Sequence, residues 1–373
     1  MIAASSRVLR CLSLVRTLTS VKVARAMGRR PAGPLFAFIE VNKACNNRCV
    51  YCSIWKTPPS ETRGLPKEVL FGALKDLAAG GCLFADLFGG EPLLRADLPE
   101  LCAHASALGM NVTVTTNGRL LDKSVFEKLA CSGVNQILIT IAGSTPQTHD
   151  RMVGVGGAFD QVLSAVSQIR ECAGRDRVLV GFNAFVSALN FRELPSMVRM
   201  ARSCDVTWIR FLPFNASFPF DHCGLGLDRL AFEPDTLGAF REKFSEAIDL
   251  TRRYGMLTNS PIFLEGVYDH FNPEHGTSYT CYAGYLFCDI GSDGTVYRCF
   301  PAKEPMGSLL EDTFSAVWRS RRAIEACAPK VLPRCRSCWQ SCYVESSVRI
   351  CLRFLPRMIP LLLQESRLFL LRD

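Results

Sequence analysis

Three cysteines lie within eight residues of one another, in the segment that runs from Cys45 through Cys49 to Cys52. Thiolates are the ligands that hold iron–sulfur clusters, and one short loop can supply three of them. A cubane cluster has four irons, so three ligands leave one iron open to bind a small molecule, as a catalytic zinc keeps one open position. A zinc knuckle is the alternative, but no further Cys or His occurs between Cys52 and Cys82.

A second short motif, Gly89-Gly90-Glu91-Pro92, follows a predicted strand. Glycines let a backbone approach a ligand closely, and free backbone N–H groups can bind a carboxylate. The Glu91 carboxylate can accept a hydrogen bond from an ammonium group. An amino acid carries both groups, so the motif favours an amino-acid-like ligand, although the same four residues also occur in ordinary turns.

Both motifs follow strands of a predicted parallel sheet. Short apolar runs alternate with helix-like segments, which is the pattern of consecutive β-α units joined by right-handed crossovers. Functional sites in such folds form at the carboxyl ends of the strands. Polar or small residues follow successive strands, as in Thr116-Asn117-Gly118 and Ala142-Gly143-Ser144. The six predicted strands are Leu35–Glu40, Leu83–Phe88, Met110–Thr115, Gln136–Ile141, Val178–Phe185 and Thr207–Leu212.

Six units are too few for a complete eight-fold barrel, so we predict an α/β fold with a partial (β/α)6, TIM-like barrel. The character of the chain changes near residue 275, where cysteines become frequent and Ser292-Asp293-Gly294 separates two strand-like runs, which indicates a hairpin. We therefore expect a small C-terminal domain that is rich in cysteine and built from a β-hairpin and helices.

The Cys-x3-Cys-x2-Cys spacing, Tyr51 before the last cysteine and the Gly-Gly-Glu-Pro motif resemble the radical S-adenosylmethionine (SAM) superfamily over about residues 35–215. The resemblance implies that the three cysteines hold a SAM-binding [4Fe-4S] cluster. It implies reductive cleavage of SAM to a 5′-deoxyadenosyl radical that abstracts hydrogen from a substrate. The residues that it assigns to SAM are Gly89, Gly90, Glu91, Thr116, Asn117 and Thr140.

The fourth strand end departs from the pattern of the family. Relatives with this layout often have Ser-x-Asp-Gly there, whereas this chain has Thr140-Ile141-Ala142-Gly143. Ala142 therefore stands in place of the acid, while Thr140 can still form a hydrogen bond. We expect SAM to be held differently at this strand, or the substrate side of the site to have changed. His149 is predicted to be a turn residue rather than a base.

A second set of cysteines lies toward the C-terminus. A hairpin and a later Cys-x2-Cys turn can close a site of four thiolates, and spacing alone does not distinguish zinc from an iron–sulfur cluster. The spacing around Gly294 and Cys299, and the run at Gly307-Ser308-Leu309, resemble the SPASM or twitch extension of radical SAM enzymes. That resemblance implies one auxiliary [4Fe-4S] cluster, whose predicted ligands are Cys281, Cys299, Cys335 and Cys338. Either Cys342 or Cys288 could replace one of these four.

Charge gathers at the two ends of the chain. The net charge is +8, yet residues 1–39 contribute +7 and residues 346–373 contribute +3, so the body is nearly neutral and shows no nucleic-acid groove. We divide the chain into a basic N-terminal tail or membrane-surface or targeting segment (1–34), a radical SAM core with the following helix (35–274), a SPASM- or twitch-like domain (275–346), and an apolar cationic tail (347–373). Eighteen cysteines without a signal peptide favour a cytoplasmic protein, and the two ends are compatible with peripheral membrane contact.

The sequence thus predicts a radical SAM enzyme that abstracts hydrogen from a peptide side chain, a lipid or a small metabolite, assisted by an auxiliary cluster. An electron donor such as flavodoxin or ferredoxin would reduce the SAM-binding cluster. The alternative from another class is a zinc-stabilised binding protein without catalytic activity. Iron content and anaerobic formation of 5′-deoxyadenosine distinguish the two.

Overall fold

The computed structural model describes residues 14, 16–172, 177–215, 229–272, 279–302, 304–327, 335, 338–351, 353–354, 356–359 and 361. Nine strands form one sheet in the order β6-β5-β4-β3-β2-β1-β7-β8-β9. The first six strands pair in parallel in the order of the sequence. They are β1 (Phe36–Glu40), β2 (Phe84–Phe88), β3 (Asn111–Thr116), β4 (Val134–Ile141), β5 (Leu179–Val186) and β6 (Trp208–Pro213).

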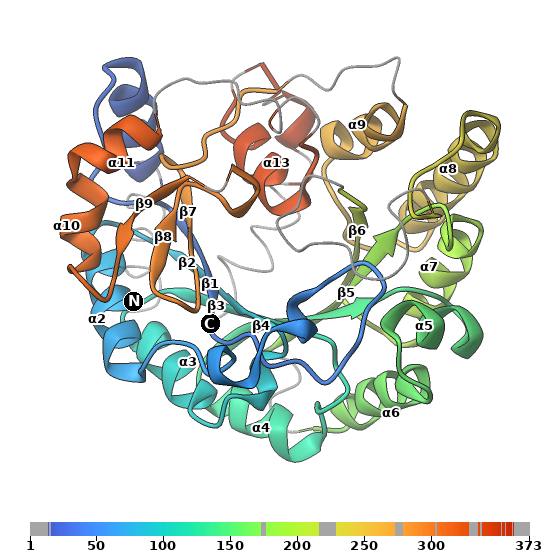
Figure 1. Cartoon of the computed structure of the whole chain (residues 1–373). Coiled ribbons are helices and arrows are strands. Elements are labelled where there is room, and N and C mark those ends of the chain that lie inside the picture. The colour runs from blue at the N-terminus through green and yellow to red at the C-terminus, as the bar shows by residue number, and fades with distance from the viewer. Residues whose placement is uncertain are drawn as a thin grey trace, which may run out of the picture.

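Helices cover the outside of this sheet as an arc that runs from α2 to α8 (Figure 1). The six predicted strands are present within two residues of their expected ends, which confirms an open α/β barrel. A helix that the sequence pattern did not predict is α5 (Pro146–Val153), which is short and mostly polar and is capped by Thr145. The other helices on this arc are α2 (Lys67–Ala79), α3 (Leu98–Ala107), α4 (Lys123–Cys131), α6 (Ala158–Arg170), α7 (Leu194–Ser203) and α8 (Leu237–Arg253).

Side-chain alternation gives the sheet two different faces. Ala85 and Leu87 of β2 are buried under the helices, whereas Asp86 between them lies on the inner face and is partly exposed. Thr113 and Thr115 of β3 lie on this same inner face. The outer face is therefore the apolar core, and the inner face carries polar groups that a ligand can contact.

The C-terminal hairpin continues the barrel sheet instead of forming a sheet of its own. Strand β7 (Phe287–Ile290) pairs in parallel with β1, and β8 (Thr295–Tyr297) and β9 (Pro305–Ser308) add antiparallel strands. The predicted turn lies between β7 and β8, where Gly294 adopts a positive φ of 88°. Helices α10 (Phe314–Arg319) and α11 (Arg321–Ala326) follow.

Helices α9 (Pro261–Phe271) and α13 (Ser341–Val348) lie together on the side of the barrel that the helical arc leaves open (Figure 1). The Asn259 side chain accepts from the Phe211 backbone N–H at 2.6 Å and donates to Ser341 Oγ at 3.1 Å. The Trp339 indole N–H donates to the Phe263 carbonyl at 2.9 Å. The cysteine-rich C-terminal region is thereby attached to both edges of the six-stranded parallel sheet.

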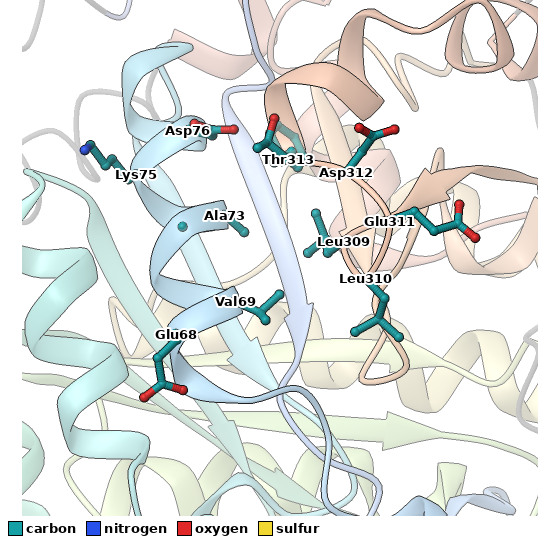
Figure 2. A pocket seen from close by; sticks show the side chains of 12 residues that line it. Glu68, Val69, Ala73, Lys75, Asp76, Leu309, Leu310, Glu311, Asp312 and Thr313 are labelled. Carbon is teal, nitrogen blue, oxygen red and sulfur yellow. The ribbon is translucent and has the colours of Figure 1, made fainter.

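A groove separates α2 from the loop that follows β9 (Figure 2). Its volume is about 530 Å³, and its walls combine apolar residues such as Leu309 with acidic ones such as Glu68 and Glu311. Beside it, Asp76 of α2 accepts from the Ser315 backbone N–H at 2.8 Å and so caps the first turn of α10. The barrel and the C-terminal region therefore adjoin at this groove as well.

The N-terminal segment is helical over residues 16–26 and contacts the body of the protein. Val21 is fully buried in the core, whereas Val23 and Met27 are half exposed. Arg30 lies 3.7 Å from the Trp318 ring and donates to the Trp318 carbonyl at 3.1 Å. Among the residues that the structure describes, no helix has the length and apolar character needed to cross a membrane.

Candidate active site and auxiliary cysteine centre

The Cys45–Cys52 loop follows β1 and is held from two sides. On one side, the backbone N–H groups of Arg48 and Val50 each donate at 2.9 Å to carbonyl groups at the C-terminal end of α5. Gly154 there has a φ of 69°, and a Cβ at this position would lie 2.3 Å from the Arg48 carbonyl oxygen. Helix α5 therefore supports the cysteine loop, and a glycine is needed where the two backbones meet.

The other side of the loop contacts the Gly89-Gly90 motif. The Gly90 N–H donates to the Asn42 carbonyl at 2.9 Å, and the Glu91 N–H donates to the Ala44 carbonyl at 2.7 Å. A Cβ on Gly90 would lie 2.3 Å from the Ala44 oxygen, and one on Gly89 would lie 2.4 Å from the Asn42 oxygen. The two glycines therefore allow the segment before Cys45 to run directly against the end of β2.

Glu91 is fully buried and connects this motif to the end of β3. Its Oε1 accepts from the Thr116 hydroxyl at 2.6 Å and from the Leu93 N–H at 3.0 Å, and its Oε2 accepts from the Asn117 N–H at 2.8 Å. Burial raises the pKa of Glu91, and these three donors oppose that shift. Since each carboxylate oxygen can accept two hydrogen bonds, Oε2 can still accept one from a ligand.

Asn117 and Arg119 extend the network back to the cysteine loop. The Asn117 side-chain amide donates to Asn46 Oδ1 at 2.7 Å, and Arg119 donates to the Asn46 carbonyl at 2.6 Å and to Asn47 Oδ1 at 3.1 Å. Arg119 was not predicted from the sequence, because nothing in its local pattern indicates a contact with residues more than seventy positions away. Five of the predicted SAM residues, from Gly89 to Asn117, thus lie in one network beside the cysteines.

Thr140 and its neighbours lie one strand further along. Thr140 is paired with Asn183 of β5, whose Oδ1 is buried without a hydrogen-bond partner, and no described hydrogen bond joins Thr140 to the Glu91 network. Nearby, His149 Nδ1 accepts from the Ala142 N–H at 3.3 Å, and burial lowers the pKa of His149 to about 4. His149 lies inside helix α5 and not in a turn as predicted, and from there its neutral, buried ring accepts from the loop that follows β4.

The three loop thiols lie close enough to influence one another. The thiol of Cys49 interacts electrostatically with Cys45, and burial raises the pKa of Cys49 to about 12. Tyr51 lies among the three thiols and stacks on Phe185 of β5 with ring centroids 3.9 Å apart. Thiols are the soft donors that an iron–sulfur cluster takes, and all three lie near Tyr51 at the rim of the sheet.

The four thiols predicted for the auxiliary cluster also lie together. Cys281 interacts electrostatically with Cys335, and Cys338 interacts with both. Cys299 interacts with Cys281, and the Tyr279 hydroxyl lies among Cys281, Cys299 and Cys338. The four predicted thiols come from the hairpin and from a distant Cys-x2-Cys segment, and each lies near at least one of the others, as the donor set of a four-thiolate cluster requires.

The two substitute ligands have different surroundings from each other. Cys288 of β7 points to the outer face of the sheet, where its thiol interacts with Cys82, Arg30 and Cys327. Cys342, in the first turn of α13, lies near Asp289 and Asp86 on the inner face and also near Cys338, one of the four predicted ligands. Within the described residues, no three or more His, Cys, Asp and Glu side chains are close enough together to hold a single metal ion.

Comparison with known proteins agrees with this geometry. The family model of the radical SAM superfamily matches residues 39–200, and that of the SPASM iron–sulfur cluster-binding domain matches residues 281–339. AdoMet-dependent heme synthase of Methanosarcina barkeri is 24% identical over 75% of this chain and 81% of its own length. PqqA peptide cyclase of Ruegeria pomeroyi is 25% identical over 82% of this chain and 79% of its own.

The fold has solved counterparts as well. Streptococcus suis SuiB, in a structure bound to precursor peptide SuiA, superposes with a TM-score of 0.64 at 17% identity, over 84% of this chain and 72% of that one. An open parallel barrel with a cysteine loop after its first strand and a cysteine-rich C-terminal extension defines a class of cluster-dependent enzymes. The chain belongs to that class as a radical SAM superfamily enzyme with a SPASM domain. Its cofactors are SAM, a SAM-binding [4Fe-4S] cluster and auxiliary iron–sulfur chemistry in the SPASM domain.

Proposed function

We propose that Cys45, Cys49 and Cys52 hold the SAM-binding cluster and that Gly89, Gly90, Glu91, Thr116 and Asn117 shape the pocket for the methionine part of SAM. When bound, the cluster and SAM supply a 5′-deoxyadenosyl radical. The observation that carries this assignment is the hydrogen-bond network through Glu91, which joins the ends of β1, β2 and β3 around the cysteine loop. Thr140 is proposed to contact SAM from β4, separately from this network.

We further propose that Cys281, Cys299, Cys335 and Cys338 hold one auxiliary [4Fe-4S] cluster. Support comes from the proximity of these thiols to one another and from the position of Cys288 on the outer face of the sheet. Four protein ligands would leave no iron of this cluster open, whereas three in the Cys45 loop would leave one.

The inner face of the barrel is the proposed place of the substrate. There Thr115 donates to Asp86 at 2.9 Å, and the Asp86 carboxylate interacts with Arg210 of β6, so both signs of charge are present. Asn183 adds a buried carbonyl oxygen without a partner. Such a mixture of donors and acceptors suits peptide amides, which offer both.

We propose that the substrate is a peptide whose side chain loses hydrogen to the radical. The PqqA peptide cyclases among the relatives support this class. The heme synthase match over most of the chain supports a second candidate, an iron porphyrin with apolar edges and carboxylates. We also propose that an electron donor such as flavodoxin or ferredoxin reduces the SAM-binding cluster. A separate proposal is peripheral membrane contact through Val23 and Met27.

The test is to incubate the reconstituted protein anaerobically with SAM, dithionite and one of two probes. The first probe is a library of synthetic peptides with deuterated side chains, and the second is iron coproporphyrin III. Deuterium in 5′-deoxyadenosine together with a mass change in a peptide supports the peptide class. A modified porphyrin with unchanged peptides contradicts it and selects the second candidate.

A further inference from the structure

Arg298 is a buried cation between the hairpin and the auxiliary cysteines. It follows β8 directly and precedes Cys299, and only 7% of the residue is exposed. Burial of a guanidinium is unfavourable unless anionic or strongly accepting groups surround it. The groups around Arg298 therefore indicate which anionic or accepting partner its guanidinium has.

The described partners of Arg298 satisfy only part of its hydrogen-bonding capacity. Nη2 donates to Cys335 Sγ at 3.5 Å, and Nη1 donates to the Ala326 carbonyl at 3.3 Å. The one acid beside it, Glu304, lies 3.7 Å away, and the buried Nε–H has no hydrogen-bond partner. A buried N–H that lacks an acceptor indicates that an acceptor is missing from the protein atoms themselves.

The Arg298 guanidinium lies beside the thiols as well as beside the acid. It interacts electrostatically with Cys281 and Cys299 as well as Cys335, three of the four proposed ligands. Gly284 allows this approach, because a Cβ there would lie 2.2 Å from Cys327 Sγ and 3.3 Å from Arg298 Cγ. The other nearby arginines differ, since Arg25 donates to the Cys281 carbonyl and Arg30 donates to Cys327 Sγ, which is not a proposed ligand.

We propose that Arg298 raises the reduction potential of the auxiliary cluster by holding a positive charge and N–H donors against its sulfur atoms. This inference rests on the proposed assignment of the four cysteines. A [4Fe-4S] cluster with four thiolates carries two negative charges when oxidised and three after it gains one electron. A fixed neighbouring cation stabilises the reduced form more, and hydrogen bonds to sulfur act in the same direction. No bond is made or broken in this step.

Arg298 is thus a positioning residue that makes the auxiliary cluster a better electron acceptor. A purely structural role, bridging Ala326 and Glu304, predicts changes in folding or in cluster loading only. The two roles are separated by measuring a potential in fully loaded protein.

The experiment uses the full chain with Cys45, Cys49 and Cys52 changed to Ala, so that only the auxiliary cluster remains, titrated with dithionite and followed by electron paramagnetic resonance (EPR). We expect Arg298→Met to weaken reduction at least tenfold, which is a shift of 59 mV to lower potential for one electron. Arg298→Lys should recover most of the shift. Arg321→Met is the matched control, because Arg321 in the same region is 91% exposed and pairs with Glu325.

Glu304→Gln provides a second variant that leaves Arg298 in place. Because it removes the acid beside the guanidinium, it should shift the potential upward, in the direction opposite to Arg298→Met. Full iron content with an unchanged potential in either variant overturns the inference. Iron that survives replacement of both Cys335 and Cys338 by Ala overturns the ligand assignment, and the inference with it, whereas loss of that iron upholds the assignment.

Discussion

The two cysteine centres of this protein are built in opposite ways. The first takes its three thiols from eight consecutive residues, and the neighbouring loops hold it through hydrogen bonds that involve the Glu91 carboxylate, the Asn117 amide and the Arg119 guanidinium. The second collects its thiols from segments up to 57 residues apart and has a buried arginine against them. A centre that binds SAM needs an open iron and a preformed binding pocket beside it. A cluster with four protein ligands that only transfers electrons needs neighbouring charges that set its reduction potential.

The difference predicts that Cys49→Ser abolishes SAM cleavage. Loss of one of only three ligands should remove the cluster, so formation of 5′-deoxyadenosine falls to the level seen without enzyme while the fold is retained. Iron should drop by about half, because the auxiliary cluster has separate ligands. Cys131→Ser is the control, since Cys131 is exposed on α4. Continued SAM cleavage in Cys49→Ser would show that another loop binds the cluster.

Replacing Cys335 and Cys338 together by Ala should remove the auxiliary cluster and leave the SAM-binding cluster in place. We expect this variant to contain about half the iron of the unmodified protein. SAM cleavage should continue, because the Cys45 loop and the Glu91 network remain intact. Formation of the substrate product should be lost. Cys342→Ala should keep all of its iron, because the four proposed ligands complete the cluster without the Cys342 thiol, which lies near Cys338, Asp86 and Asp289. A loss of iron in Cys342→Ala would make that residue a ligand.

Gly90→Ala should damage the first centre by a steric route. The new Cβ would lie 2.3 Å from the Ala44 oxygen, so the cysteine loop must shift away from β2. Overpacking of this kind lowers the free energy of unfolding by about 1–3 kcal/mol, and we expect weaker SAM binding in equilibrium dialysis. Gly72→Ala is the matched control, since its Cβ meets nothing within 4 Å in the middle of α2. That variant should gain roughly 0.5–1 kcal/mol.

Replacing Asp86, which lies on the inner face between the two centres, should have a smaller effect, on how the free energy of unfolding depends on pH. Burial raises the pKa of Asp86 from 3.8 to about 6. Between these values the folded state keeps a proton that the unfolded state has lost, so the contribution of Asp86 to the free energy of unfolding falls as the pH rises toward 6. Asp86→Asn should remove this slope, as measured by urea unfolding at several pH values. An identical slope in the variant would contradict the raised pKa.

The barrel could be predicted from the sequence because each strand is a short apolar run followed by a helix. The Cys45 loop could be predicted as well, because its ligands are adjacent in the chain. The supporting contacts of Arg119 with Asn46 and Asn47 could not, since they span more than seventy residues and depend on how two loops meet.

The second centre was only partly accessible from the sequence. Spacing left Cys288 and Cys342 as substitute ligands. Strand alternation turns Cys288 to the outer face, whereas Cys342 lies near Cys338 and stays a candidate substitute. Arg298 had no local signal, because its partner Cys335 lies 37 residues further along the chain. Helix α5 was missed because its few apolar residues are too short a sample of helical periodicity.

The most direct measurement is EPR spectroscopy of the reduced protein with and without SAM, using two variants that each keep one centre. The variant with Ala at Cys335 and Cys338 retains the loop centre, and its spectrum should change when SAM is added. The variant with Ala at Cys45, Cys49 and Cys52 retains the auxiliary centre, and its spectrum should stay the same. A spectrum that changes with SAM only in the second variant would contradict the assignment of the open iron to the Cys45 loop.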